Sequence, residues 1–274
     1  EFNRLLSSAI SAYGEPELES NKIETQNPEK QQTINNKNYY LINSLDEIDK
    51  WIEEAEEVGE VAVDTETTSL DPHQADLVGI SLCSKIGKAC YIPVGHKLPK
   101  CINKDKVIKK LKKILEDPSI KKIGQNIKFD FIVFYKQGIT LSSMEDTMLM
   151  SYVLDAGKNR HNMDTLSEIH LDHKTISFKD VVGTGKKQIN FGEVEINLAK
   201  NYAAEDSDIT YRLYKIFAKN LKLEKLINIY EIFEKPLIEI LALMEIYGVK
   251  VDQKFLQLLS NKFEKKTYQL EKEI

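Results

Sequence analysis

Acidic side chains recur in this sequence at spacings that suit metal-assisted chemistry. Asp64 and Glu66 stand two residues apart at the end of the apolar segment Glu60–Asp64, and Asp130 and Asp206 follow in two later segments. Since side chains alternate between the two faces of a strand, the first two carboxylates would lie on one face. A carboxylate inside a core is costly without a cation or a hydrogen-bond donor, so acids that converge on one point indicate a metal site.

Hydrolysis of a phosphodiester bond is the reaction that such a group of acids serves best. The reaction needs an attacking hydroxide and stabilisation of the charge on the leaving 3′ oxygen, and two divalent cations roughly 4 Å apart supply both. Hard cations such as Mg²⁺ take oxygen ligands and keep several waters. We therefore expect separated acids, at the ends of strands and helices, to meet at one site.

Each acidic segment also has a purely structural interpretation. The composition of residues 64–69 is typical of a turn. Asp130, in the first turn of an expected helix, would offset the helix dipole. Tyr202 and Asp206 stand four residues apart, so on a helix they share a face and could form a structural hydrogen bond. Taken singly, the segments leave both interpretations open.

The hydrophobic pattern predicts a mixed sheet flanked by helices. We expect strands at residues 39–42, 60–64, 77–83, 89–94 and 120–123, and helices at 44–58, 104–115, 128–136, 146–154, 163–170, 194–220, 230–247 and from about 253. The early strands follow one another and the later one alternates with helices, which favours an α/β fold. Ser44 followed by Glu47 predicts a capping box, and Trp51 is expected to pack in the core.

Composition divides the chain into three parts. Residues 1–38 are rich in Glu, Asn, Gln, Lys and Ser without apolar periodicity, which predicts a linker or mobile tail. Residues 39–225 form the main domain. Residues 226–274 are expected to be helical, and the last helix has an apolar face without a predicted partner, which indicates a second domain that is cut short. The lack of an initiator Met at Glu1 favours a fragment or a processed form.

Bulk composition narrows the function only a little. The chain has 274 residues and a formal net charge of −5, which argues against nucleic-acid binding through bulk positive charge, although metal-binding acids themselves lower the net charge. No apolar run reaches the roughly 20 residues that span a bilayer, and no secretory signal is present. Cys83, Cys90 and Cys101 lack metal-binding spacing and are expected to be thiols in a reducing compartment.

Five ordered motifs give the acids a family context. They follow one another at compatible spacing as VDTETTSLD, IGQNIKFD, RHNMD, HKTISF and NYAAEDSDIT. The set resembles the tyrosine-containing DEDD exonucleases, in particular the proofreading domain of family A (bacterial polymerase I-type) DNA polymerases, over about residues 39–222. The later segment EKPLIEILALMEIYGVKVD is similar to that family's lead-in to its polymerase domain.

This resemblance implies a fold and a division into domains. The implied fold is ribonuclease H-like (DnaQ-like), a mixed central sheet flanked by helices, with a C-terminal helical stub. Residues 39–225 would be a 3′→5′ exonuclease domain, and residues 226–274 the truncated, helical start of a polymerase domain. Because the polymerase catalytic motifs are absent, the chain itself is not expected to polymerise.

The resemblance also implies roles for the matching residues. Asp64, Glu66 and Asp206 would hold the metal ion that activates water. Asp64 would also reach a second ion, and Asp130 would contact that ion through water. Tyr202 would orient the attacking water by its hydroxyl. The implied cofactors are two divalent cations, Mg²⁺ or Mn²⁺, and all four acids and the tyrosine are present.

Substrate-binding residues follow from the same resemblance. Leu70 stands where the family uses a leucine to separate the terminal bases. The other residues that would line the single-strand path are Thr67, Gln125, Asn126, Phe129, Arg160 and Phe178. Stacking on rings and pairing of arginine with phosphate tolerate any base sequence, whereas core packing is the alternative for Leu70 and both phenylalanines. The family often has a tyrosine in place of Phe129, and Lys186 and Lys187 are expected in a loop near phosphate.

The implied function is removal of nucleotides from the 3′ end of DNA as nucleoside monophosphates. The implied partners are a single-stranded 3′ end or frayed primer terminus and the polymerase domain of the same longer protein, and we expect a monomer without membrane contact. An RNase D-like exoribonuclease and a non-catalytic nucleic-acid-binding module are the alternatives. The polymerase-like segment at residues 234–252 argues against the first, and the intact acids argue against the second.

The expected localisation rests on the composition and on a resemblance to one group of polymerases. Abundant Lys, Asn and Ile indicate an AT-rich genome, and the sequence is similar to the plastid-type (apicoplast) polymerases of parasitic protists. We therefore expect residence in that organelle after removal of a targeting segment, with the cytoplasm as the alternative and secretion excluded.

Overall fold

The computed structural model describes residues 34, 38–97, 101–185 and 188–273. The predicted tail lies outside these ranges except for Ile34 and Asn38, and the predicted phosphate contacts Lys186 and Lys187 lie outside them too. Within the described ranges, no helix combines the length and the apolar character that crossing a membrane requires.

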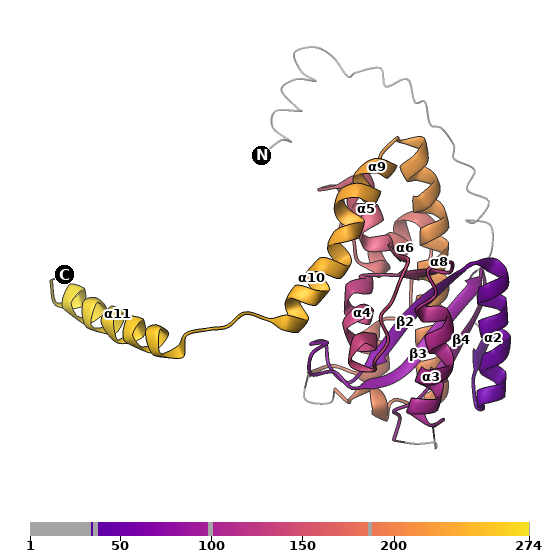
Figure 1. The fold of residues 1–274 in the computed structure, drawn as a ribbon, viewed down its shortest axis with the longest axis horizontal. Coiled ribbons are helices and arrows are strands. Elements are labelled where there is room, and N and C mark those ends of the chain that lie inside the picture. Colours follow the sequence, from indigo (N-terminus) through magenta and orange to yellow (C-terminus); the bar gives the residue numbers. More distant parts are fainter. Residues whose placement is uncertain (1–33, 35–37, 98–100, 186–187, 274) are drawn as a thin grey trace, which may run out of the picture. The chain divides into compact units, whose positions relative to one another are not determined.

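In the described part of the chain, six strands form one mixed sheet (Figure 1). They are β1 (Tyr39–Leu41), β2 (Glu60–Thr67), β3 (Leu77–Lys85), β4 (Lys88–Pro93), β5 (Lys121–Gly124) and β6 (Met144–Asp146). Their order across the sheet is β1-β4-β3-β2-β5-β6. β2, β3 and β4 form an antiparallel meander, while β1 pairs with β4, β5 with β2 and β6 with β5 in parallel. The predicted mixed sheet is confirmed.

Helices cover both faces of the sheet. The helices of the described residues are α2 (Leu45–Val58), α3 (Lys104–Leu115), α4 (Ile127–Lys136), α5 (Thr147–Asp155), α6 (Met163–Leu171), α7 (Phe178–Val182), α8 (Ile196–Leu223), α9 (Ile227–Ile229), α10 (Lys235–Tyr247) and α11 (Gln253–Glu273), of which α2, α3 and α4 pack on one face and α8 on the other. A 3₁₀ turn, Phe191–Glu193, precedes α8, and a π-helical turn, Tyr230–Glu234, lies between α9 and α10. The predicted helices are confirmed with small shifts at their ends, except that the one predicted from Tyr230 begins with the π turn.

Three short elements and one helix cap differ from the sequence-based expectation. β6, α7 and α9 were not predicted, because elements of three to five residues are too short to show a periodicity. Ser44 precedes α2, but its side chain does not cap the helix backbone, so the predicted capping box is wrong. Glu47 instead accepts hydrogen bonds from the Ser44 hydroxyl and the Asn43 N–H, both at 3.1 Å. The hydroxyl is thus engaged by the carboxylate.

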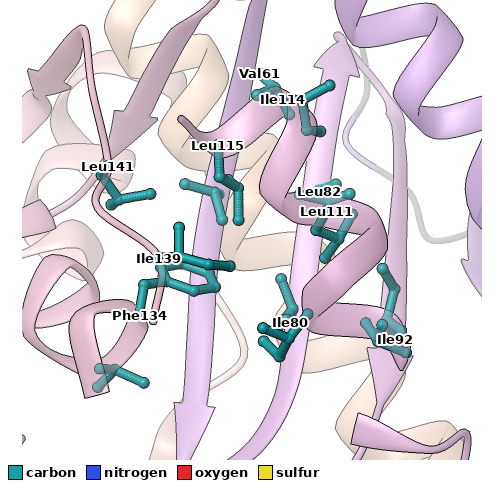
Figure 2. Close-up of a cluster of buried hydrophobic side chains, with 14 of the residues drawn as sticks. Val61, Ile80, Leu82, Ile92, Leu111, Ile114, Leu115, Phe134, Ile139 and Leu141 are labelled. Carbon is teal, nitrogen blue, oxygen red and sulfur yellow. The ribbon is translucent and has the colours of Figure 1, made fainter. Parts of the chain in front are cut away.

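Side chains alternate between the two faces of the sheet and pack into different hydrophobic cores. Val63 of β2 packs into the core formed with α2, α3 and α4, whereas the adjacent Ala62 packs into the core formed with α8. Figure 2 shows the first core, where Leu82 of β3 lies beside Leu111 of α3. Trp51 is only 7% exposed in this core, which confirms its predicted packing. The same alternation continues into the acidic end of β2.

The segment after α8 contributes to both cores. Tyr230 is buried in the α8 core, and Ile238 and Ala242 of α10 are buried in the other. None of the described residues of α11 is buried. Large apolar side chains are exposed on both last helices, among them Ile240, Met244, Tyr247, Phe255, Leu258 and Phe263. The domain boundary near residue 226 stays a prediction.

Hydrogen bonds to a buried carboxylate, Asp208, join α8 to the edge of the sheet. Asp208 and Arg212 have side chains that are 0% and 1% exposed, and Arg212 Nε donates to Asp208 Oδ1 at 3.1 Å. The Tyr39 hydroxyl donates to Asp208 Oδ2 at 2.9 Å, and the Gly87 N–H donates to Oδ1 at 2.7 Å. Although Asp208 stands two residues after Asp206, these contacts assign it to the structure of the domain.

We expect Asp208→Ala to lower the free energy of unfolding by about 3–5 kcal/mol, because it leaves Arg212 buried without a counter-ion. The control is Glu56→Ala. The Glu56 ion pair with Lys113 joins side chains that are 36% and 69% exposed, and such pairs contribute about 0–1 kcal/mol. Urea denaturation followed by circular dichroism measures both losses. Similar losses in the two variants would contradict the structural role of Asp208.

Candidate active site

Two strand acids and one helix acid meet at the end of β2. Asp64 and Glu66 share the face of β2 that carries Ala62 and packs against α8. Asp206 reaches the same point from α8. One carboxylate oxygen from each of the three acids can be chosen such that these oxygens lie within 4.8 Å of one another. The structure therefore brings these residues together as the period-two alternation along β2 predicts.

Burial makes this group of acids electrostatically costly. Glu66 and Asp206 are 6% and 5% exposed, and Glu66 Oε1 and Asp206 Oδ1 have no hydrogen-bond partner among the described residues. Burial raises the pKa of Asp64 to about 6. Burial, and after it the charge of neighbouring carboxylates, raises the pKa of Glu66 and of Asp206 well above the usual range. A divalent cation would favour the ionised form of all three, so this all-oxygen donor set fits a hard metal ion.

Asp130 approaches the end of β2 from the other face of the sheet. It lies in the first turn of α4 and is 3% exposed. Its Oδ1 accepts hydrogen bonds from the Thr65 N–H at 2.9 Å and from the Thr65 hydroxyl at 2.5 Å. Burial and then the charge of Asp64 raise the pKa of Asp130, while the bonds from Thr65 oppose that rise. Asp130 is thus near the acid group without being one of the three converging acids.

Tyr202 stands on α8 one turn before Asp206, and its hydroxyl opposes the rise in the pKa of the Asp206 carboxyl. Burial, and then the charges of Asp206 and Glu66, raise the pKa of Tyr202 well above its usual value, so the hydroxyl stays protonated. The rings of Phe178 and Phe191 stack on each other with 6.3 Å between centroids and a 4° interplanar angle. Their centroids lie 6.0 and 5.9 Å from that of Tyr202. The two phenylalanines thereby fix the tyrosine ring.

A cavity of about 580 Å³ opens over these residues. The predicted site residues that line it are Asp64, Glu66, Thr67, Leu70, Gln125, Asn126, Phe129, Asp130, Phe178, Tyr202 and Asp206. Leu70 is 87% exposed and Phe178 is 36% exposed, so core packing explains neither. Phe129 is partly buried and packs against the α2–α3–α4 core while it lines the cavity. Their roles toward a substrate stay predictions.

Arg160 is the predicted site residue that does not line the cavity. It is exposed in the loop before α6. Its neighbour His161 is tied to the site, because the Gln125 side chain donates to the His161 carbonyl at 2.8 Å and His161 Nδ1 lies 2.9 Å from the Ser151 hydroxyl. Contact of Arg160 with phosphate therefore requires a strand that extends from the cavity to this loop.

The structure adds cavity residues that the sequence did not single out. Thr65, Thr68 and Ser69 lie within the motif VDTETTSLD, whereas Gln188, Ile189, Asn190 and Phe191 lie outside the five motifs. The Asn190 side chain donates to the Thr68 carbonyl at 3.2 Å, which joins the loop before α8 to the loop after β2. No pattern predicts a pairing of two aperiodic loops so far apart in the chain. Asn190 and Glu193 do form a capping box, a signal that could have located the turn at Phe191.

The sheet order, the helices on both faces and the acid group define a nuclease domain of ribonuclease H-like architecture. Residues 39–222 match the 3′–5′ exonuclease family, and the chain belongs to this family.

Known proteins agree with this assignment. DNA polymerase I of Rhizobium leguminosarum is 42% identical over 257 residues, which cover 86% of this chain and 25% of that protein. DNA polymerase I of Pseudomonas aeruginosa is 40% identical over 232 residues, which cover 82% and 25%. The chain thus spans about a quarter of the length of these curated relatives. The structure of Brucella melitensis NrnC with bound Mg²⁺ shares the fold, with a TM-score of 0.54 and 24% identity over 80% of this chain and 94% of that one.

Without divalent metal, we expect the contribution of Asp64 to the free energy of unfolding to fall as pH rises from 3.8 to about 6. In that window the folded state binds more protons than the unfolded state, because the folded Asp64 has the higher pKa. At pH 8 in EDTA, Asp64→Asn with Glu66→Gln should therefore raise the free energy of unfolding by at least about 1 kcal/mol.

Addition of Mg²⁺ tests whether Asp64 and Glu66 hold a metal ion. We expect Mg²⁺ to raise the melting temperature of the wild type and to leave that of the double variant nearly unchanged. Thermal denaturation with and without the metal measures both. Equal stabilisation of the two proteins would mean that Asp64 and Glu66 do not hold the ion.

Proposed function

We propose that this chain is a metal-dependent 3′→5′ DNA exonuclease that hydrolyses terminal phosphodiester bonds and releases nucleoside monophosphates. The observation that carries the proposal is the convergence of Asp64, Glu66 and Asp206 within 4.8 Å beside an open cavity, with two buried carboxylate oxygens that no described residue satisfies. Membership of the 3′–5′ exonuclease family supports the direction of digestion. The likeness to DNA polymerase I favours DNA over RNA as the substrate.

Two divalent cations, Mg²⁺ or Mn²⁺, are the proposed cofactors, and when bound they supply charge neutralisation and a hydroxide at neutral pH. Asp64, Glu66 and Asp206 would hold one ion. Asp64 would also reach the second, which Asp130 would contact through water. Since Thr65 engages Oδ1 of Asp130, the other carboxylate oxygen is the proposed contact. The Mg²⁺ bound to Brucella melitensis NrnC favours magnesium as the first ion to test.

Tyr202 is proposed to orient the attacking water. Its raised pKa keeps the hydroxyl proton available for donation, and the ring is held by Phe178 and Phe191. The hydroxyl also lowers the pKa of the adjacent Asp206 carboxyl, so the two groups lie close together. A water that accepts from this hydroxyl would be directed toward the acid group.

The cavity walls are proposed to bind the last nucleotides without reading their sequence. Leu70, which is exposed at the cavity edge, would separate the terminal bases. Phe129 and Phe178 would stack on bases, and such stacking tolerates every base. The remaining polar contacts to the strand are assigned to Thr67, Gln125, Asn126 and Arg160.

The wider setting is proposed from the relatives. The chain would be the proofreading module of a DNA polymerase, and residues 226–274 would be the start of the polymerase domain. The exposed apolar side chains of α10 and α11 support a further domain that covers them. The proposal also includes a monomeric state and residence in an organelle.

A digestion assay tests the activity. We expect the chain with Mg²⁺ to shorten a 5′-labelled single-stranded DNA from its 3′ end, with EDTA or the Asp64→Asn, Glu66→Gln double variant abolishing the products. Denaturing gels of a time course on DNA and on RNA of the same sequence measure this. Preferential trimming of RNA would favour the RNase D-like alternative. DNA binding without cleavage would favour a non-catalytic module, and cleavage by the double variant would refute the metal-ligand assignment.

The variant Tyr202→Phe tests whether the tyrosine hydroxyl orients the attacking water. We expect kcat to fall by about 100-fold with little change in single-strand binding, because an aligned hydrogen-bond donor at a reacting centre contributes about that much. Tyr40→Phe is the control, since Tyr40 is a half-exposed tyrosine on the edge strand β1. Single-turnover rates and fluorescence anisotropy in Ca²⁺ measure the two quantities. An unchanged rate would show that the hydroxyl does not orient the water.

A further inference from the structure

Asp146, at the end of β6, holds two helices by their N-terminal backbone. Its carboxylate accepts hydrogen bonds from the N–H groups of Asn126 and Ile127, both at 3.1 Å, where α4 begins. It also accepts from Met148 at 2.9 Å and Leu149 at 3.4 Å, in the first turn of α5. The side chain is 1% exposed. The motifs that predicted the active site do not include this acid.

The turn that Asp146 holds before α4 is conformationally demanding. Asn126 has a φ of 61°, in the left-handed region that few non-glycine residues other than asparagine and aspartate adopt. Gly124 has no room for a side chain, because a Cβ would lie 2.7 Å from the Ile127 Cβ. Asn126 and Phe129 line the cavity. The hydrogen bonds to Asp146 therefore help to decide where this wall of the cavity lies.

Asp146 is in turn held by Tyr230, from the segment between α9 and α10. The Asp146 N–H donates to the Tyr230 hydroxyl at 2.9 Å, and that hydroxyl donates to Glu145 Oε2 at 3.0 Å. Lys235 Nζ donates to Glu145 Oε1 at 2.7 Å. Tyr230 is 0% exposed. Hydrogen bonds at the backbone N–H and at the carboxylate of Asp146 thus link this segment to the first residues of α4.

The π-helical turn Tyr230–Glu234 permits this double contact with Glu145. In an α-helix five residues make about 1.4 turns, so side chains five apart point in different directions. A π turn holds more residues per turn and brings Tyr230 and Lys235 nearer to one face. Both side chains consequently reach the same carboxylate.

We propose that Tyr230 is a positioning residue for strand binding at the exonuclease site. Through Asp146 it holds the turn before α4, and so it places Asn126 and Phe129 against the substrate strand. The inference rests on the proposed function, because it names a determinant of binding at that same site.

The chemical step has a separate support on the same helix. Asp130 accepts two hydrogen bonds from Thr65 of β2, and neither bond passes through Asp146. Loss of the Tyr230 hydroxyl should therefore weaken strand binding more than it slows hydrolysis. This difference separates positioning of the strand from a general loss of structure.

The test compares Tyr230→Phe with Tyr39→Phe in the full chain. The control is matched, because Tyr39 is a buried tyrosine whose hydroxyl also donates to a buried carboxylate, Asp208, at 2.9 Å. For Tyr230→Phe we expect KM for a single-stranded DNA oligonucleotide to rise about tenfold while kcat changes less than threefold. We expect faster amide hydrogen exchange at Asn126 and Ile127. Tyr39→Phe should leave KM and the exchange at these two amides unchanged.

Each outcome decides the proposal. Unchanged KM and exchange in Tyr230→Phe, or equal changes in Tyr39→Phe, would overturn it. If Tyr230→Phe does not fold, Lys235→Met removes the outer contact with Glu145 and should give the same changes at smaller size, and their absence would overturn the proposal. If the wild type does not hydrolyse DNA, the proposed function fails, whereas the exchange rates still report whether Tyr230 holds the turn.

Discussion

Repulsion among buried carboxylates at the end of β2 is the constraint around which this domain is arranged. β2 directs Asp64 and Glu66 to one face, and Asp206 faces them from α8. Because buried like charges disfavour the ionised form, the carboxylates stay close only when the surrounding backbone holds them there. β3 pairs with β2 along the acidic segment, opposite Asp64 and Glu66, and supplies that rigidity. A bound cation would then convert the repulsion into affinity.

Hydrogen-bond saturation separates the structural acids of the domain from those of the cavity. Asp146 accepts four backbone N–H groups, and Asp208 accepts from a hydroxyl, a backbone N–H and a guanidinium. Glu66 and Asp206, by contrast, keep buried oxygens without a partner among the described residues. Asp130 lies between these cases, since Thr65 engages one of its oxygens. Whether the oxygens of a carboxylate all have hydrogen-bond donors therefore indicates whether the acid supports the fold or binds a ligand.

The sequence allowed prediction of those features that local periodicity encodes. The bounds of α3 and the shared face of Asp64 and Glu66 follow from spacing alone. Features that depend on distant partners were missed or misjudged. Asp146 was expected to begin a helix, because nothing near it in sequence reveals that it also binds the backbone before α4. The prediction of a capping box at Ser44 was wrong because the serine hydroxyl donates to the Glu47 carboxylate instead of capping the helix backbone. The sequence motif does not distinguish these two hydrogen bonds.

The role of β2 on both sides of the sheet limits how the chain can change in length. Thr65 serves α4 on one face, while its two neighbours serve α8 on the other. Insertion or deletion of a single residue within β2 would exchange these faces and turn the cavity acids toward the α4 core. The register shift between Glu66 and Thr67 marks where the strict alternation ends. Changes of length are therefore tolerable only beyond that bulge, where the loop toward β3 can absorb them.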